Sequence, residues 1–343
     1  MPSHKYVYHV CGSPTSKFFY DLSLIYARNT FVPAGWEEQF IVVEPDGKWR
    51  IGNSLCHLSR KSTPQKIIAG LHSKAIVVPH LFCLEGMTTY RKFFEEILCY
   101  QVVGSSGDVM AVAADKNLSR QRVKSHGVQI AGGGLTSEID VHSLQLPIII
   151  KPNTEDNSVG LSMITKASDI DNAIKHAKAF GGAVLAEQYI SGREIRIAVI
   201  ETSTGFFVPP MIEYLVSAQN PIRRTSDKLK LNRSGQPENQ VQSTPIEMVC
   251  PAHLDSFLQK RLSDLAIRAH KALGARDYSL FDFRVHDGTD MPYFLEAGLF
   301  WSFSEAGMIT KMLRASDLPI EDLIGEIWDR RLLKKAFYEK TYE

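Results

Sequence analysis

Apolar runs alternate with helical repeats over the N-terminal third of the chain. Short apolar runs at residues 5–10, 40–44 and 75–79 are typical of buried strands. Between the first two runs, residues 18–28 carry apolar side chains at helical spacing. Strands that alternate with helices in this way predict a parallel α/β domain, to which we assign residues 1–105.

The middle of the chain changes pattern after a Gly-Ser-Ser-Gly turn. Residues 108–127 predict a helix that is interrupted near Lys116. The segment 146–151 is an almost wholly apolar strand that ends in a lysine, and residues 183–189 predict another strand. We assign residues 106–183 to a central subdomain.

A β-hairpin is predicted in the C-terminal third of the chain. Its strands are residues 278–285 and 292–297, and the Asp-Gly-Thr-Asp sequence between them has turn chemistry. If the turn is centred on Thr289, Asp282 and Glu296 are equidistant from it and face each other across the ladder. Their Cβ atoms are then expected roughly 5 Å apart.

Two carboxylates that face each other among aromatic and aliphatic neighbours repel one another and resist burial. A divalent cation between them removes that cost. Hard oxygen ligands, few in number, suit a Mg²⁺ ion that is carried on the phosphates of a nucleotide. The alternative is that one carboxylate pairs with Arg284 or Arg276 and the other is solvated.

Further candidate groups stand at the ends of strands. Lys151 lies at the edge of the predicted core, where it either faces a ligand or reaches into water. The polar loop 153–160 can wrap phosphate oxygens with its backbone N–H groups, although it lacks the Walker A spacing. Backbone groups beside Glu187 can bind an adenine edge, and Glu194 can bind ribose hydroxyls. As isolated residues, both glutamates are more often solvated surface charges than ligand contacts.

The segment 217–247 is polar and rich in turns, and it contains Arg223, Arg224 and Lys228. A long basic loop inside an enzyme is typical of a lid over an anionic substrate, and a surface excursion is the alternative. This segment and the hairpin both fall in residues 184–343, which we assign to a C-terminal subdomain.

Composition narrows the class of protein. A formal net charge of +1 over 343 residues argues against a nucleic-acid binder dominated by phosphate contacts. The five cysteines are scattered, odd in number and without CxxC spacing, which fits reduced thiols in a cytoplasm. No apolar run approaches the ~18 residues of a transmembrane helix. We therefore expect a soluble cytoplasmic protein with neither a membrane nor a nucleic acid as partner.

The order of these features resembles the ATP-grasp fold, and in particular the D-alanine–D-alanine ligase family. The matching motifs run in sequence as DK, KP, a small-residue loop ending in VG, EQYISGRE, a basic segment, and FDF followed by FLEAG. The resemblance covers nearly the whole chain. It implies a three-domain ATP-grasp fold of mixed α/β (α+β) class, and an ATP-dependent ligase that forms carbon–nitrogen bonds with Mg²⁺. ATP-grasp relatives are frequently dimers, so a homodimer is expected by analogy.

The resemblance also implies roles for individual residues, and these fall into groups that contact the nucleotide phosphates, the adenosine moiety and the metal. The implied residues are Lys116, Lys151, Ser158 and Lys228 at the phosphates; Glu187, Gln188, Ile190 and Leu295 around adenine; Glu194 at the ribose; and Asp282 and Glu296 as ligands of Mg²⁺. The catalytic candidates are Lys151, Lys228 and Arg284.

Three departures from the family pattern affect the acceptor half of the site. The family's arginine on the metal-binding strand, which steadies the acyl phosphate, is replaced by Leu280. The asparagine two residues past the metal-binding glutamate is replaced by Gly298. The glycine-serine-glutamate signature that binds the first D-alanine is missing from residues 11–18. The ATP half is kept and the dipeptide half is rebuilt, which implies a different acceptor.

Four segments look like the ligases of mycosporine-like amino acid biosynthesis, the MysD type. They are PHLFCLEGMTTYRKFF, EYLV with PIR and DKLK, DYSLFDFRV, and FLEAGLFWSF. This closer resemblance implies coupling of an amino acid such as serine or threonine to mycosporine-glycine. The products would be ADP, phosphate and an imine such as shinorine or porphyra-334.

The residues that would bind this acceptor stay open. Its carboxylates need cations, for which Arg284, Arg223 and Arg224 are the first candidates. The aromatic residues Phe300 and Trp301, together with Phe303, either wall a pocket for a flat conjugated ring or pack in the core. Two other functions are compatible with the sequence, namely a peptide ligase for other amino acids and a nucleotide-binding relative without turnover.

Overall fold

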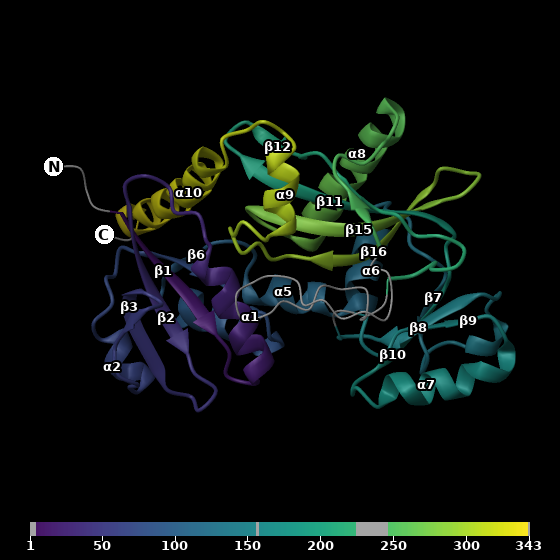
Figure 1. Ribbon diagram of the computed structural model, residues 1–343, viewed down its shortest axis with the longest axis horizontal. Coiled ribbons are helices and arrows are strands. Elements are labelled where there is room, and N and C mark those ends of the chain that lie inside the picture. The colour runs from purple at the N-terminus through teal and green to yellow at the C-terminus, as the bar shows by residue number, and fades with distance from the viewer. Residues whose placement is uncertain (1–4, 156–157, 224–245, 342–343) are drawn as a thin grey trace.

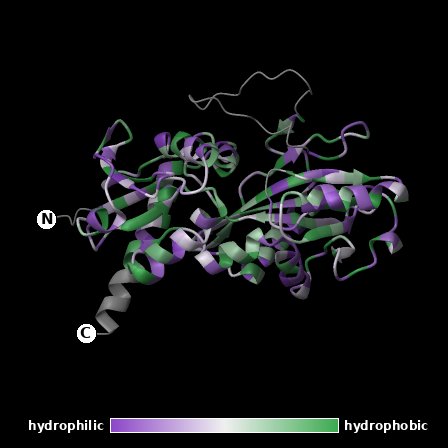
Figure 2. Ribbon diagram, turned by 90° about the horizontal axis from the view of Figure 1, so that it is seen from below, coloured by the Kyte–Doolittle hydropathy of each residue, from purple (hydrophilic) through white to green (hydrophobic). Residues whose placement is uncertain are grey.

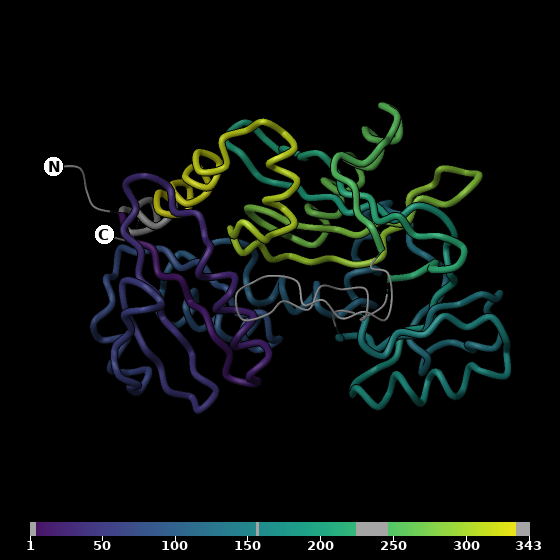
Figure 3. Tube along the Cα trace, in the orientation of Figure 1, coloured from purple at the N-terminus to yellow at the C-terminus, as the bar shows by residue number. Residues whose placement is uncertain are grey.

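The described part of the chain folds around three β-sheets with helices packed against them. The computed structural model describes residues 5–155, 158–223 and 246–341. The N-terminal sheet and the central sheet lie at two ends of the molecule, and the C-terminal sheet lies between and above them (Figures 1 and 3). Hydrophobic residues concentrate on the strands and on the inward faces of the helices (Figure 2). The expected mixed α/β class is confirmed.

The N-terminal sheet has the strand order β4-β3-β2-β1-β5-β6. Strand β1 is parallel to β2 and β5, and β5 is parallel to β6, whereas β3 and β4 extend the edge as antiparallel strands. The predicted parallel arrangement is therefore correct for β2, β1, β5 and β6, and wrong for β3 and β4. The bounds are β1 (Lys5–Gly12), β2 (Trp36–Val43), β3 (Trp49–Ser54), β4 (His57–Leu58), β5 (Ile76–Pro79) and β6 (Gln101–Val102), with α1 (Lys17–Arg28), α2 (Pro64–Ile68), α3 (Leu84–Met87), α4 (Thr89–Lys92) and η1 (Phe93–Ile97).

The predicted interrupted helix is confirmed as two helices, α5 (Gly107–Ala114) and α6 (Lys116–Ser125). Asp115 separates them in an extended conformation, and its carboxylate accepts a hydrogen bond of 2.8 Å from the backbone N–H of Leu118. This N-cap starts the second helix and fixes Lys116 in its first turn.

The central sheet is antiparallel, with the strand order β7-β10-β8-β9 and helix α7 on one face. Strand β10 lies in its middle, so the predicted division after residue 183 cuts this sheet in front of residues 184–188. The bounds are β7 (Gly133–Leu135), η2 (Val141–Ser143), β8 (Ile148–Pro152), β9 (Ser162–Ile164), η3 (Ala167–Asp169), α7 (Ile170–Lys178) and β10 (Val184–Gln188).

The C-terminal sheet has the strand order β14-β13-β11-β15-β16, with β12 paired to β11. Because side chains alternate along a strand, Ile195 and Ile197 of β11 face helix α8, and Glu194 and Arg196 face the opposite side. The bounds are β11 (Gly192–Thr202), β12 (Gly205–Phe207), β13 (Ile212–Tyr214), β14 (Met248–Val249), α8 (Ser256–Leu273), β15 (Tyr278–His286), β16 (Pro292–Gly298), α9 (Met308–Arg314) and α10 (Ile320–Thr341). Among the described helices, none has the length and apolar character to span a membrane.

Helix α10 packs against the N-terminal sheet. Trp328 of α10 is fully buried and packs edge-on against Trp36 of β2, with ring centroids 5.4 Å apart. Asp277, which is 1% exposed, accepts hydrogen bonds from the backbone N–H of Gly104 (2.8 Å) and from Nε of Arg331 (2.6 Å). One carboxylate thus joins the linker before α5, the start of β15 and helix α10.

We predict that Asp277→Asn lowers the free energy of unfolding by about 2–4 kcal/mol, because it leaves the buried Arg331 without its counter-ion. Asparagine tolerates the left-handed backbone of this position, where φ is 65°, so backbone strain does not enter. Urea denaturation checks the value. Asp290→Asn is the matched control, since Asp290 is also left-handed (φ 48°) but exposed. Equal stability of the two variants would contradict the role of Asp277.

Candidate functional site

A solvent-accessible cleft lies between the central and C-terminal sheets. It is lined by every predicted site residue that the structure describes, namely Lys116, Lys151, Ser158, Glu187, Gln188, Ile190, Glu194, Asp282, Arg284, Leu295 and Glu296. The remaining one, Lys228, lies outside the described residues. The structure therefore brings the predicted residues together, and their individual roles stay predictions.

The hairpin of β15 and β16 has the predicted register. Asp282 pairs directly with Glu296 across the ladder. The register shifts after this pair, because Phe283 lies opposite Phe294 and leaves Leu295 as the extra residue of a bulge. A bulge redirects the side chains near it, and here Leu295 lines the cleft beside the two carboxylates.

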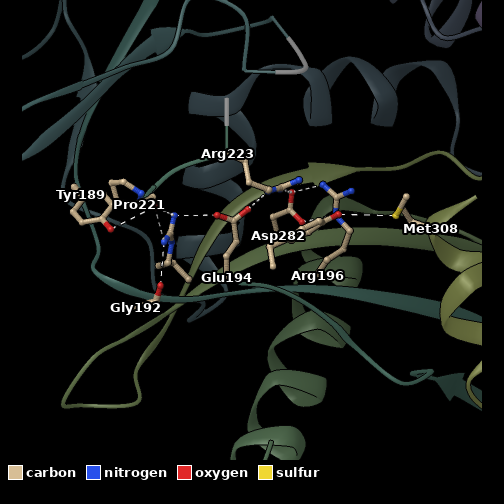
Figure 4. Close-up of polar contacts among 10 residues, drawn as sticks. Tyr189, Gly192, Glu194, Arg196, Pro221, Arg223, Asp282 and Met308 are labelled. Atoms are coloured by element: carbon tan, nitrogen blue, oxygen red, sulfur yellow. Dashed lines mark hydrogen bonds and ion pairs between the residues drawn. The ribbon is translucent and has the colours of Figure 1, made fainter. Parts of the chain in front are cut away.

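Strands β11 and β15 carry a checkerboard of four charges on the face toward the cleft. Glu194 lies opposite Arg284 in the register, and Arg196 lies opposite Asp282. Nε and Nη2 of Arg196 each lie 2.6 Å from an oxygen of Asp282, and Nη2 of Arg284 lies 2.9 Å from Oε2 of Glu194 (Figure 4). Each charge has an opposite charge beside it on the neighbouring strand.

The alternative that Arg284 or Arg276 pairs with one of the two hairpin carboxylates is wrong. Arg284 pairs with Glu194, and Arg276 pairs with Glu95, whereas the partner of Asp282 on the neighbouring strand is Arg196. The sequence analysis missed Arg196, although it stands two residues after Glu194 on a strand and so had to share its face. Burial alone would lower the pKa of Arg196, but the Asp282 carboxylate raises it well above its ordinary value.

Arg223 bridges the two anions of the checkerboard from above. Its Nε donates to Glu194, and its Nη2 lies 3.0 Å from Oδ2 of Asp282 (Figure 4). The guanidinium also stacks on the ring of Tyr214, 3.8 Å from the ring centroid. Arg223 lines the cleft, as expected of a candidate anion-binding residue, but here both of its ion pairs are with the protein itself.

Arg284 is held on several sides. Besides Glu194, its guanidinium donates to the backbone carbonyls of Gly192 and Pro221, each at 3.1 Å. These bonds tie the start of β11 to the segment that carries Arg223. The predicted catalytic role of Arg284 stays a prediction.

The lysine side of the cleft is also paired. Nζ of Lys151 lies 2.6 Å from Oε1 of Glu187, and Nε of Arg120 lies 3.3 Å from its Oε2. Burial alone would raise the pKa of Glu187, but Lys151 and Arg120 together lower it. Lys151 is 7% exposed and both Glu187 and Glu194 are 4% exposed, so the alternatives of a lysine reaching into water and of solvated glutamates were wrong.

The loop after β8 approaches the cleft beside Lys116. Nζ of Lys116 donates to the backbone carbonyl of Glu155, and Ser158 adopts a left-handed conformation with φ 59°. Gly160, with φ 69°, closes the loop where a Cβ atom would lie 2.8 Å from the ring of Pro152. Residues 156–157 are outside the described residues, so the predicted phosphate contacts of this loop stay a prediction.

The chemistry of the carboxylates fits a magnesium ion. Glu296 makes no hydrogen bond or ion pair with any other residue that the structure describes, and it faces Asp282. Over the described ranges, no cluster of three or more His, Cys, Asp or Glu residues could hold a metal ion. Two hard oxygen ligands suit a Mg²⁺ ion that takes its remaining ligands from phosphates and water.

Comparison with known proteins gives the family. Residues 134–329, more than half of the chain, match the family model described as the D-ala D-ala ligase C-terminus. The chain belongs to the D-alanine–D-alanine ligase family. A D-alanine–D-alanine ligase from Bordetella petrii is 27% identical over 237 residues, which are 68% of this chain and 68% of that protein.

Solved structures give the fold. The D-alanine–D-alanine ligase from Coxiella burnetii superposes with a TM-score of 0.74 at 17% identity, covering 99% of this chain and 97% of the other. The VanG D-Ala:D-Ser ligase from Enterococcus faecalis gives 0.73 at 18% identity, covering 95% and 98%. The expected ATP-grasp fold is confirmed. This family member is an ATP-dependent ligase that forms carbon–nitrogen bonds between small molecules, and ATP and Mg²⁺ are the cofactors of the family.

The aromatic residues after β16 mostly belong to the core. Trp301 and Phe303 are 2% and 0% exposed, and their rings stack with centroids 4.4 Å apart. Core packing is therefore the correct alternative for these two. Phe300 is only partly buried and packs edge-on against Phe82 of the N-terminal domain, at 5.4 Å between centroids.

We predict that Glu296→Gln abolishes the gain in ADP affinity that Mg²⁺ provides and leaves metal-free ADP binding unchanged. Turnover should fall by about 100-fold or more, because the metal contributes several kcal/mol of charge stabilisation. Calorimetric titration with ADP, in Mg²⁺ or in chelator, separates the two effects. Glu305→Gln is the control, since Glu305 is an exposed partner of Arg314 away from the cleft. A Mg²⁺-dependent gain of wild-type size in Glu296→Gln would exclude Glu296 as a ligand.

Proposed function

We propose that this ligase couples an amino acid, such as serine or threonine, to mycosporine-glycine and releases ADP and phosphate. The observation that carries the proposal is the chemistry around Leu280. The resemblance expects an arginine there for the acyl phosphate, but Leu280 is apolar, 7% exposed and packed in the core. The cations of this site stand instead at Arg196 and Arg223. An acceptor that is not activated as a carboxyl phosphate fits this change.

The N-terminal domain supports the same proposal. The family binds the ammonium group of its first D-alanine through a glutamate signature, but residues 11–18 contain no acidic side chain. Ser13 is fully buried, and its hydroxyl accepts hydrogen bonds from the backbone N–H groups of Thr15 (3.2 Å) and Ser16 (3.3 Å). With the Ser13 hydroxyl engaged in a turn and no acidic residue among them, residues 11–18 supply no counter-ion for an amino acid's ammonium group.

The proposed reaction has two steps. The γ-phosphoryl group of ATP is transferred to the ketone oxygen of the cyclohexenone ring, which gives an enol phosphate and ADP. The amino nitrogen of the second substrate then attacks the same ring carbon, the carbon–oxygen bond breaks, and phosphate departs with that oxygen. Loss of a proton from nitrogen leaves the imine.

The chain's own residues stabilise charge in these steps. Lys151 and Lys116 line the cleft, and the family resemblance assigns them to the nucleotide phosphates. Positioned cations lower the barrier to phosphoryl transfer by offsetting charge in a site shielded from water. Bound Mg²⁺ supplies further charge neutralisation at the phosphates. The contribution of Lys228 stays a prediction from the sequence.

A peptide ligase that acts on other amino acids is the second candidate. It is favoured by the 27% identity to a D-alanine–D-alanine ligase and by the structural likeness to a D-Ala:D-Ser ligase. A nucleotide-binding relative without turnover is the third, suggested by the loss of two functional side chains at Leu280 and Gly298.

A single assay separates these functions. The protein is incubated with ATP and Mg²⁺, with or without mycosporine-glycine, and with a pool of amino acids. We predict phosphate release only when mycosporine-glycine is present, together with a product whose ultraviolet absorption is shifted to the red by the longer conjugation of an imine. Phosphate release with amino acids alone would favour the peptide ligase. Nucleotide binding without release in any mixture would favour the third candidate.

A further inference from the structure

Arg223 touches both ends of the nucleotide site. Its guanidinium contacts Glu194, which the family resemblance assigns to the ribose, and Asp282, which it assigns to the metal. The Arg223 side chain is 12% exposed and lines the cleft. A single side chain therefore spans the positions that the two halves of a magnesium nucleotide would occupy.

The charges explain why an arginine is held there. Glu194, Asp282 and Glu296 bring three negative charges to one end of the cleft, and Arg196 and Arg284 bring two positive charges. Without Arg223 the group carries a net charge of −1 in a largely buried setting, which is unfavourable. Arg223 neutralises it when no other cation is present.

A metal ion competes with this arrangement. Oδ2 of Asp282 already accepts hydrogen bonds from Arg196 (2.6 Å) and Arg223 (3.0 Å). A divalent ion at this carboxylate would place a double positive charge beside the Arg223 guanidinium, and like charges at such a distance repel strongly. A ribose competes with Arg223 as well, because its hydroxyl groups would donate to the Glu194 carboxylate, which now accepts from the Arg223 guanidinium.

The three arginines of the site differ in how freely they can leave. Arg196 sits beneath the cleft on β11 and holds both oxygens of Asp282, and it is not among the cleft-lining residues. Arg284 is fixed by two backbone carbonyls. Arg223 alone of the three lies on a non-regular segment, and among the residues that the structure describes its anchors are the two carboxylates and the face of Tyr214.

We propose that Arg223 is a placeholder cation, displaced when the metal binds Asp282 or the nucleoside binds Glu194, so that each ligand promotes binding of the other. Whichever ligand arrives first breaks the Arg223 contacts, and the second binds without that opposing step. The freed guanidinium is then available to the anionic groups of the substrates. The proposal rests on the nucleotide site and is independent of the acceptor, so its tests use no acceptor.

The first test measures Mn²⁺ binding to the nucleotide-free protein by electron paramagnetic resonance. Arg223→Gln should bind Mn²⁺ about fivefold or more tightly than the wild type, because the competing cation is gone. The gain should disappear in the double variant Arg223→Gln/Asp282→Asn. Arg223→Lys keeps a charge but loses the fork that spans both carboxylates, so its affinity should be intermediate.

Arg193→Gln is the matched control. Like Arg223, Arg193 binds carboxylate oxygens through Nε and Nη2, which lie 2.7 and 2.6 Å from Glu213, but it lies on β11 and does not line the cleft. The Arg193→Gln variant removes the same charge as Arg223→Gln and should leave Mn²⁺ affinity unchanged. An Arg223→Gln affinity no higher than that of the wild type or of the Arg193→Gln control would overturn the proposal, as would a gain that survives Asp282→Asn.

The second test uses adenosine, which has no phosphate to bridge to the metal. In the wild type, saturating Mg²⁺ should increase adenosine affinity about fivefold or more, measured by calorimetry. In Arg223→Gln this coupling should vanish, because neither ligand has an arginine to displace. Adenosine binding that is indifferent to Mg²⁺ in the wild type, or coupling that persists in the variant, would refute the placeholder. Loss of the mycosporine activity alone would leave both tests unaffected.

Discussion

The pairing of strands β11 and β15 determines the site, because it sets four charges against one another in two opposite pairs. Glu194 faces Arg284 and Arg196 faces Asp282. Each ion is largely buried, and a partner lost from a buried pair leaves an uncompensated charge that costs about 3–5 kcal/mol. A slip of either strand by one residue would turn its two charged side chains to the face that packs on α8 and leave the two on the other strand unpaired. The charges thus enforce the register, and the register places Asp282, the predicted metal ligand.

Local rules predicted the parts of the site that lie within one hairpin or one strand. Turn chemistry around Thr289 and the alternation of strand side chains together put Asp282 opposite Glu296. The interruption predicted near Lys116 and the apolar run before Lys151 located two lysines at the ends of their elements. The family resemblance added the expectation that these elements meet, which single segments do not contain.

The rest depended on contacts between distant segments. Alternation along the strand shows that Arg196 shares a face with Glu194, but one strand's sequence does not show which strand lies beside it. The pairing of β11 with β15, and so the contact of Arg196 with Asp282, was therefore not predicted. The bulge at Leu295 was not predicted either, because no glycine or other turn-forming residue stands at that position. Strand β10 joined the central sheet because of its pairing with β7 and β8, which composition around residue 183 does not reveal.

The placement of α10 has a consequence for how the polypeptide matures on the ribosome. This helix, near the very end of the sequence, covers apolar residues of the first sheet, among them Val7, Ile76 and Val78. During synthesis this face of the N-terminal sheet therefore stays uncovered until residues 320–341 have been made. An exposed apolar sheet face of this kind is prone to association with other chains. The N-terminal sheet is thus synthesised well before the helix that covers it.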